Sequence, residues 1–364
     1  MEEVLDIPLL INEEFWASEV IDGVNMNARV LVTGGAGFIA HHVIEKILNS
    51  TDWEIISLDR LDFSGNLNRL HDLLKDHASR ERVKIVYHDL KAEINPMIAK
   101  SIGPVDYILH LAAGSHVDRS IEYPMEFVLD NVVGTCNVLN FAREQKYLRR
   151  FVYFSTDEVF GPAPDNIKYK EHDRYNSTNP YSASKAGGEE LCVAFENTYG
   201  IPMTITHTMN VFGERQHPEK YIPMCIRRVR DGEKIFIHSD STKTIPGSRH
   251  YIHAKDVADA LMFLLCKTPT NEKDQTGARL MKYNLVGKEE INNLQLAEMI
   301  ARAQNKPLNY ELIDFHSSRP GHDLRYALDG SLMEKLGWVP KYSFSERVDQ
   351  VVNWYLTNRE WLDV

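Results

Sequence analysis

The stretch VLVTGGAGFIAHHVIEKIL at residues 30–48 decides the fold. A β-branched apolar run is followed by a cluster of glycines, and then by apolar residues at helical spacing. This order predicts a strand, a tight turn and a helix, in which Gly34, Gly35 and Gly37 let the backbone approach a pyrophosphate closely. The helix that begins there offers its unpaired N–H groups to the phosphates. The pattern therefore predicts a dinucleotide-binding unit.

The same alternation of short apolar runs and helical patterns continues to about residue 210. Strands that are apolar on both faces and alternate with helices are typical of a parallel sheet covered on both sides. We expect strands at 29–33, 54–58, 83–87, 106–111, 150–155 and 202–208, and helices near 38–49, 66–78, 124–146 and 181–199. The predicted fold class is therefore a Rossmann-type, doubly wound α/β sheet.

Beyond residue 210 the pattern becomes irregular and predicts a smaller, discontinuous α/β domain. Its helix candidates lie near 220–231, 254–267, 293–305 and 345–356. We expect an N-terminal extension over 1–27, a Rossmann domain over 28–210 with about 251–275, and the second domain over 211–250 and 276–364.

Composition excludes several classes of function. A net charge of −11 argues against a nucleic-acid or anionic-membrane surface. No apolar run approaches the roughly 20 residues of a membrane span, and the acidic N-terminus lacks the features of a signal peptide. The four cysteines fit no zinc or redox spacing, so we expect reduced thiols in a cytoplasmic protein and no metal site.

The residue that follows the second predicted strand bears on the coenzyme. Asp59 can accept hydrogen bonds from the hydroxyl groups of a ribose and would repel a 2′-phosphate, which favours NAD over NADP. Arg60, next to it, is the one feature here that favours a phosphate. Ala40 stands where a third glycine is expected, and its methyl group is small enough for the helix to pack on the strand.

Two further motifs carry reactive side chains. In YSASK (181–185), Tyr181 and Lys185 lie on one face of a helix, where an ammonium and a cationic nicotinamide would favour the phenolate. In STDEVFG (155–161), Thr156 and the adjacent acids Asp157 and Glu158 follow an apolar strand. Taken alone, two such acids are either a solvated turn or an acid and a base that face a substrate.

Together the motifs resemble a known family. TGGAGFI (33–39), HLAA (110–113) and the Tyr181–Lys185 spacing are similar to those of the extended short-chain dehydrogenases/reductases. Five further motifs resemble those of a narrower family, the nucleoside-diphosphate-glucose 4,6-dehydratases, above all those that act on dTDP-glucose. These motifs are STDEVFG, SHVDRS (115–120), NPYSASKAGGEEL (179–191), HPEKYIP (217–223) and RPGHDLRYALD (319–329). The resemblance spans residues 28–361. It implies an NAD-dependent hydro-lyase that produces a 4-keto-6-deoxy sugar and water.

The resemblance also implies a role for each catalytic residue. Tyr181 would take the proton from O4 of the sugar while C4 gives up hydride, with Thr156 hydrogen-bonded to O4 and Lys185 on the nicotinamide ribose. Glu158 would remove the proton from C5, and Asp157 would protonate the departing hydroxyl of C6. Repulsion between the two carboxylates and unequal burial are a means of separating their pKa values.

The remaining implied residues bind ligands. The coenzyme would contact Gly34, Gly37, Phe38, Ile39, Asp59, Asp89, Leu90, Ala112, Tyr181 and Lys185. The nucleotide sugar, held largely by the second domain, would contact Ser115, Asn210, Lys220, Arg249, Asn284 and Arg319. Family members pair through two long helices, here 124–146 and 181–199, so a homodimer is expected.

Two departures from the family pattern leave other substrates open. Gly114 replaces an acid or amide, and His250 replaces an acid. UDP-glucose or a UDP-amino sugar therefore remains an alternative substrate. A sugar-nucleotide epimerase or decarboxylase is a second alternative, against which Asp157 argues. A non-catalytic NAD-binding protein is a third, and the complete set of reactive residues argues against it.

Overall fold

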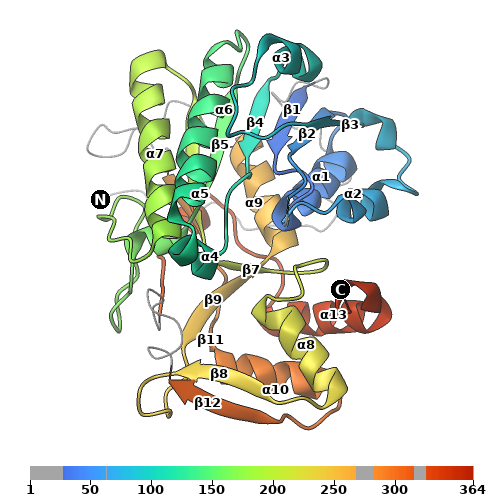
Figure 1. Ribbon diagram of the computed structural model, residues 1–364, viewed down its shortest axis with the longest axis vertical. Coiled ribbons are helices and arrows are strands. Elements are labelled where there is room, and N and C mark those ends of the chain that lie inside the picture. Colours follow the sequence, from blue (N-terminus) through green and yellow to red (C-terminus); the bar gives the residue numbers. More distant parts are fainter. Residues whose placement is uncertain (1–27, 63, 268–281, 315–324, 364) are drawn as a thin grey trace, which may run out of the picture.

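The larger lobe is built on a seven-stranded sheet. The computed structural model describes residues 28–62, 64–267, 282–314 and 325–363 (Figure 1). All of the strand pairs in this sheet are parallel, in the order β10-β6-β5-β4-β1-β2-β3. The strands are β1 (Arg29–Thr33), β2 (Glu54–Asp59), β3 (Val83–Tyr87), β4 (Tyr107–His110), β5 (Arg150–Thr156), β6 (Met203–Thr208) and β10 (Lys282–Leu285). The Rossmann-type prediction is confirmed.

The seventh strand corrects the expected division of the chain. We placed residues 276–364 in the smaller domain, but β10 pairs with β6 at the edge of the large sheet. Helix α12 (Ser331–Lys335) packs on β10, and Met333 and Trp338 are buried in the same core as β1. A parallel edge strand can be supplied by a distant segment because its connection has to cross over the sheet in any case.

Helices cover both faces of the sheet. On one face, α1 (Phe38–Ser50) and α9 (Ala254–Lys267) bury Ile44, Ile47 and Leu261 completely. On the other face, Leu139 of α6 (Gly134–Arg143) and Cys192 of α7 (Pro180–Tyr199) are also fully buried. Each fully buried aliphatic side chain contributes about 2 kcal/mol. Shorter elements of this lobe are α2 (Leu67–Leu74), η2 (Arg80–Arg82), α3 (Pro96–Ile102) and α4 (Val117–Glu122).

The segment expected as one helix over 124–146 contains a wider turn. It consists of α5 (Pro124–Val128), the π-helical turn η3 (Leu129–Val133) and α6. The N–H of Gly134 donates to the carbonyl of Leu129, five residues earlier, as a π turn requires. Such turns are frequent at functional sites.

Local signals define helix α7. Asn179 caps its N-terminus in a reciprocal capping box with Ser182, and Pro180 occupies the first turn. Gly200 ends the helix in the left-handed conformation, with φ of 72°. The cap places Tyr181 in the first turn, close to the carboxyl edge of the sheet.

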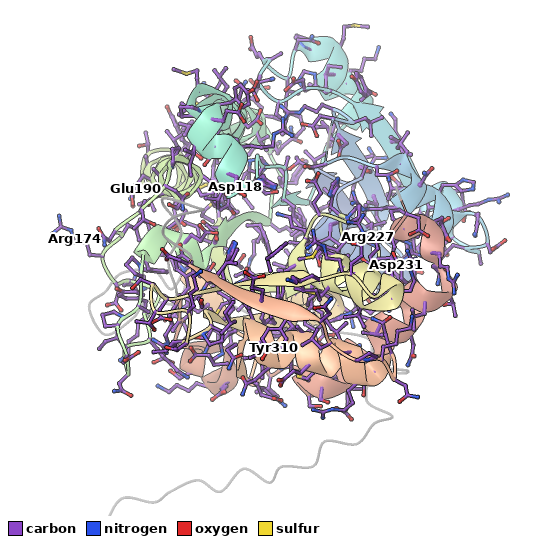
Figure 2. The ribbon with its side chains drawn as sticks, turned by 60° about the horizontal axis from the view of Figure 1, so that its bottom comes forward. Asp118, Arg174, Glu190, Arg227, Asp231 and Tyr310 are labelled. Atoms are coloured by element: carbon purple, nitrogen blue, oxygen red, sulfur yellow. The ribbon has the colours of Figure 1, made fainter. Side chains whose placement is uncertain are left out.

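The smaller lobe has its own core, below the sheet in Figure 1. Helices α8 (Tyr221–Asp231), α10 (Asn293–Ala303) and α13 (Phe344–Thr357) bury Ile226, Ile300 and Val348 against one another. Figure 2 shows Arg227 and Asp231 on α8, and Tyr310 on β12, at the outer surface of this lobe. Its strands form two small sheets, β11 (Glu290–Asn292), β9 (Ser248–His253) and β7 (Asn210–Phe212), and β12 (Tyr310–Asp314) with β8 (Ile235–Ser239); η5 (Arg359–Trp361) follows α13.

Residues 1–27, expected as an extension, lie outside the described part of the chain. Within the described ranges, no helix is both long enough and apolar enough to cross a bilayer.

Candidate active site

The glycine turn leaves bare backbone at the start of α1. Gly34 has φ of +69°, and a Cβ atom on it would lie 2.8 Å from the Cα of Ala112, which follows β4. A Cβ on Gly37 would lie 2.8 Å from the carbonyl oxygen of Gly34. No side chain caps the helix, whose N-cap is Gly37. An uncapped helix N-terminus without side chains fits the pyrophosphate of a dinucleotide.

Asp59 links the glycine turn to the end of β2. Its Oδ2 accepts a hydrogen bond from the N–H of Ala36 at 3.0 Å, and its Oδ1 accepts one from the N–H of Leu61 at 2.8 Å. Burial raises the pKa of this carboxyl. Each carboxylate oxygen keeps a second acceptor position, so a ribose hydroxyl can still be received there.

The other expected coenzyme residues share the same edge of the sheet. Phe38 and Ile39 open α1, Asp89 and Leu90 follow β3, and the N–H of Ala112 donates to Thr33 Oγ1 at 3.2 Å. Ligands of doubly wound sheets bind outside the carboxyl ends of the strands. The structure therefore gathers these residues where a dinucleotide would lie.

The acid pair follows β5 directly. Thr156 Oγ1 accepts a hydrogen bond from the N–H of Glu158 and donates to Asp157 Oδ1 at 3.1 Å, at the start of η4 (Asp157–Phe160). Asp157 is only 5% exposed, and its Oδ2 is buried without a hydrogen-bond partner. Burial, together with the charge of Glu158, raises the pKa of Asp157 to about 7, against the opposing charge of Arg249.

Glu158 has a more polar environment. Its side chain is partly exposed, and its Oε2 accepts a hydrogen bond from Asn179 Nδ2 at 3.0 Å. The two neighbouring carboxyls therefore differ in burial and in partners, as an acid and a base that act at one pH require.

Burial shifts the pKa values of Tyr181 and Lys185 in opposite directions. Lys185 Nζ donates to the carbonyl of Phe154 at 2.7 Å and lies 4.2 Å from the centre of the Tyr153 ring. Burial lowers the pKa of Lys185 to about 8, which Glu189 opposes. Burial and the charges of Glu158 and Asp157 raise the pKa of Tyr181 instead of lowering it. The lysine here is held by a strand carbonyl and does not offset this rise.

A buried carboxylate that the sequence analysis missed joins β5 to α7. Glu189 is fully buried and accepts hydrogen bonds from Ser155 and Tyr175, with His207 Nε2 at 3.2 Å. Burial alone would raise the pKa of Glu189, but His207, Lys282 and Ser155 lower it to about 2. Figure 2 shows that the adjacent Glu190 points outward from α7. The pair of acids in GGEEL is the signal that could have found it, because successive helical residues face different sides.

A second missed residue lies in the π turn. Asn131 is 1% exposed and exchanges hydrogen bonds with the backbone of Gly114, whose N–H donates at 2.8 Å and whose carbonyl accepts at 3.0 Å. Its Nδ2 also lies 2.8 Å from Ser184 Oγ on α7. Asn131 thus links the loop after β4 to the helix of Tyr181. An asparagine within the apolar run around 127–133 is the only signal for it.

The residues expected to bind the substrate differ in their exposure and in their partners. Arg249 on β9 is partly exposed, stacks over Tyr326 at 4.8 Å, and its charge acts on Asp157. Ser115 and Asn210 are exposed, and Lys220 precedes α8. Arg319 lies outside the described residues.

Asn284 does not fit its expected role. It is 0% exposed on β10, where its Nδ2 donates to the carbonyls of Tyr169 and Asp329 and its Oδ1 lies 3.0 Å from His207 Nδ1. These bonds satisfy the amide within the protein and hold the edge strand in place. We therefore leave Asn284 out of the substrate site.

Neighbouring side chains occupy the space around both positions, Gly114 and His250, at which the chain departs from the family pattern. A side chain on Gly114 would begin 3.1 Å from the ring of Phe127 and 3.2 Å from Asp130 Oδ2, so these residues fill that space. His250 is 3% exposed, and its Nε2 lies 3.6 Å from Glu290, which also pairs with Arg325. His250 is thus part of the β9–β11 contact.

Fold and site together define the class. A parallel sheet, a glycine turn and a Tyr-x-x-x-Lys helix beside an acid pair are those of an extended short-chain dehydrogenase/reductase. The family model described as GDP-mannose 4,6 dehydratase matches residues 31–351, and the chain belongs to this family.

Individual relatives are similar over most of their length. A dTDP-glucose 4,6-dehydratase of Escherichia coli is 35% identical over 360 residues, covering 92% of this chain and 95% of the relative. The low-salt glycan biosynthesis protein Agl12 of Haloferax volcanii is 36% identical, covering 91% and 99%. The crystal structure of DesIV, a dTDP-glucose 4,6-dehydratase from Streptomyces venezuelae with NAD bound, has a TM-score of 0.80 and 32% identity, covering 92% and 99%.

The raised pKa of Asp157 predicts a dependence of stability on pH. A carboxyl whose pKa is about 7 in the folded protein and about 3.9 in the unfolded chain stabilises the fold at low pH, and this contribution is lost as pH rises toward 7. Asp157→Asn removes the titration. The free energy of unfolding of the variant, relative to the original protein, should therefore rise by on the order of 2 kcal/mol between pH 5 and pH 7.5.

Chemical denaturation at both pH values measures this difference. The control is Asp165→Asn, which changes an exposed aspartate; its difference from the original protein should not change with pH. An equally constant difference for Asp157→Asn would show that Asp157 is already ionised at pH 5.

Proposed function

We propose that the protein is a nucleotide-sugar 4,6-dehydratase that converts dTDP-glucose, or a related nucleoside-diphosphate glucose, to the 4-keto-6-deoxy sugar and water with bound NAD. The observation that carries the proposal is the buried Asp157 carboxyl with a pKa near 7, next to the more exposed Glu158. Simple oxidation of an alcohol has no use for an additional acid and base, whereas removal of water needs both. The names of the relatives in Escherichia coli and Streptomyces venezuelae support the same reaction.

The proposed roles follow from the surroundings of each side chain. Bound NAD would accept hydride from C4 of the sugar and return it to C6, and its positive ring would favour the Tyr181 phenolate. Tyr181 takes the O4 proton, and Thr156 donates a hydrogen bond to O4. The resulting ketone acidifies the C5 proton, which Glu158 removes. Asp157, which its raised pKa of about 7 leaves partly protonated at neutral pH, gives its proton to the C6 hydroxyl. Water leaves, and Glu158 returns a proton to C5. Tyr181 then releases the proton it took from O4 and Asp157 takes one up from solvent, so that no net proton is consumed.

We propose that the smaller lobe holds the nucleoside diphosphate. Arg249 and Lys220 place positive charge on that lobe, and the planar guanidinium of Arg249 suits phosphate oxygens. The influence of Arg249 on the pKa of Asp157 supports a short path from diphosphate to sugar. The nucleotide base is left to experiment, with UDP as the alternative.

Purified protein should be incubated with dTDP-, UDP- and GDP-glucose and with UDP-glucuronate, without added coenzyme, and the products analysed by mass spectrometry and NMR spectroscopy. We expect loss of one water from dTDP-glucose, because the hydride is borrowed and returned in each cycle. An unchanged mass with inverted C4 would indicate an epimerase instead. Loss of carbon dioxide from UDP-glucuronate would indicate a decarboxylase, and no reaction with any sugar nucleotide would indicate a non-catalytic protein.

Replacing the proposed base should separate oxidation from water loss. In Glu158→Gln, the oxidation at C4 should persist, because Tyr181 and Thr156 remain, while dehydration falls by at least 100-fold. Stopped-flow absorbance should then show reduced coenzyme that accumulates and does not decay. The control is Glu190→Gln, on the outer side of α7, which should behave like the original protein. Dehydration at the original rate by Glu158→Gln would remove Glu158 from the mechanism.

We further propose that the protein forms a homodimer in the cytoplasm. Apolar side chains are exposed on the helical segment formed by α4, α5 and η3, from Leu129 at 38% to Met125 at 65%. Exposed apolar surface of this kind on helices is typical of a contact between subunits. The four cysteines are all free thiols, which suits a reducing compartment.

Met125→Asp should disrupt the dimer, because it would bury a charge at the contact. Light scattering should give about twice the chain mass of 41.8 kDa for the original protein and the mass of one chain for the variant. Met97→Asp changes a still more exposed methionine on α3 and should remain dimeric. A monomeric original protein would contradict the proposal.

A further inference from the structure

Arg60 is held by carboxylates on every side of its guanidinium. Its Nε donates to Asp62 Oδ2 at 2.7 Å, and its Nη1 and Nη2 donate to the two oxygens of Asp130 at 2.5 and 2.8 Å. Asp89 Oδ1 lies 3.5 Å from Nη1. The bidentate pair with Asp130 joins two segments that are 70 residues apart in the chain.

The position of Arg60 matters for the coenzyme. Arg60 directly follows Asp59 and lies beside Asp89, two of the residues expected to contact the coenzyme. An arginine near the acid at the end of the second strand is the side chain that accommodates a 2′-phosphate in NADP-binding proteins. A free guanidinium here would therefore offset the repulsion between Asp59 and a 2′-phosphate.

Asp130 prevents this. Its side chain is 10% exposed, and the π turn η3 directs it at Arg60. A planar fork paired with both oxygens of one carboxylate has its best-directed donors occupied. The carboxylates of Asp62 and Asp89 also lie within ion-pair distance of the same guanidinium, and Asp59 is close enough for the charge of Arg60 to act on its pKa. A 2′-phosphate would bring roughly two more negative charges to a group of four acids and one base.

We propose that Asp130 is a specificity-determining residue, which excludes NADP by holding Arg60 in a bidentate ion pair. The inference rests on the proposed use of a nicotinamide dinucleotide. It adds the interaction, the ion pair between Asp130 and Arg60, by which the site selects NAD over NADP. Asp59 alone, with a free arginine beside it, would leave the choice weakly determined.

The test measures binding, independently of turnover. Protein freed of nucleotide is titrated with NAD and with NADP by calorimetry, for the original chain, Asp130→Asn, Arg60→Ala and the double variant. In Asp130→Asn the Kd for NADP should fall at least tenfold, while the Kd for NAD changes less than threefold. Arg60→Ala should bind NADP as weakly as the original chain, because the held arginine contributes nothing. The double variant should lose the gain, because the gain requires the released guanidinium.

The control makes the same substitution in a distant ion pair. Asp231 on α8, labelled in Figure 2, pairs with Arg230 with its Oδ1 2.8 Å from Nε. Asp231→Asn should change neither Kd. Asp130→Ser serves as the second variant if Asp130→Asn unfolds at too low a temperature for the titration. Asp130→Glu, which keeps a carboxylate at this position, should keep the preference for NAD.

Three results would overturn the inference while leaving the proposed function intact. One is an unchanged ratio of the two Kd values in folded Asp130→Asn and Asp130→Ser, and the second is a gain in NADP binding that survives Arg60→Ala. The third is an original chain that binds NADP as well as NAD. A chain that binds neither dinucleotide overturns the proposed coenzyme along with it.

Discussion

One buried carboxylate, that of Glu189, determines how the reactive segments meet. Its oxygens bind Ser155, the residue before Thr156, and it lies one helical turn beyond Lys185. Breaking a buried charged network costs several kcal/mol, because the remaining partners are left without compensation. His207 and Lys282 extend the network to β6 and β10. The end of β5, helix α7 and the edge of the sheet therefore keep one relative position, which the chemistry of Thr156, Glu158 and Tyr181 requires.

Within that frame, unequal burial differentiates side chains that look alike in the sequence. Asp157 and Glu158 are neighbours of the same chemical type, yet one has an unpartnered oxygen in the interior and the other is bound to the cap of α7. Glu189 and Glu190 show the same contrast across one helix. The function of each acid is thus determined by the side of its element on which it lies, which a composition or a motif alone does not express.

The sequence predicted those features that depend on neighbouring residues. Six of the parallel strands, the glycine turn and helix α7 follow from local apolar patterns, glycines and caps. Strand β10 did not, because it is four residues long and its partner β6 ends 74 residues earlier. The same limit applies to the site. The motifs STDEVFG and YSASK are visible in the sequence, whereas the internal hydrogen bonds of Asn284 and the ion pair between Arg60 and Asp130 involve partners that are distant in the chain. In the protein alone, burial is the largest cause that raises the pKa of Tyr181, and the sequence did not show this burial.

The π turn at Leu129–Val133 has a consequence for how this segment can change over evolutionary time. A π turn closes over five residues instead of four, so it behaves as a one-residue insertion absorbed within a helix. The residues before and after it follow two different helical phases. Deleting one residue there would restore a regular helix but would rotate α5 against α6 by about 100°. Asp130 and Asn131 would then no longer both face the carboxyl edge of the sheet while Val128 and Leu129 face outward. The number of residues in this helix is therefore constrained, in addition to the identity of its side chains.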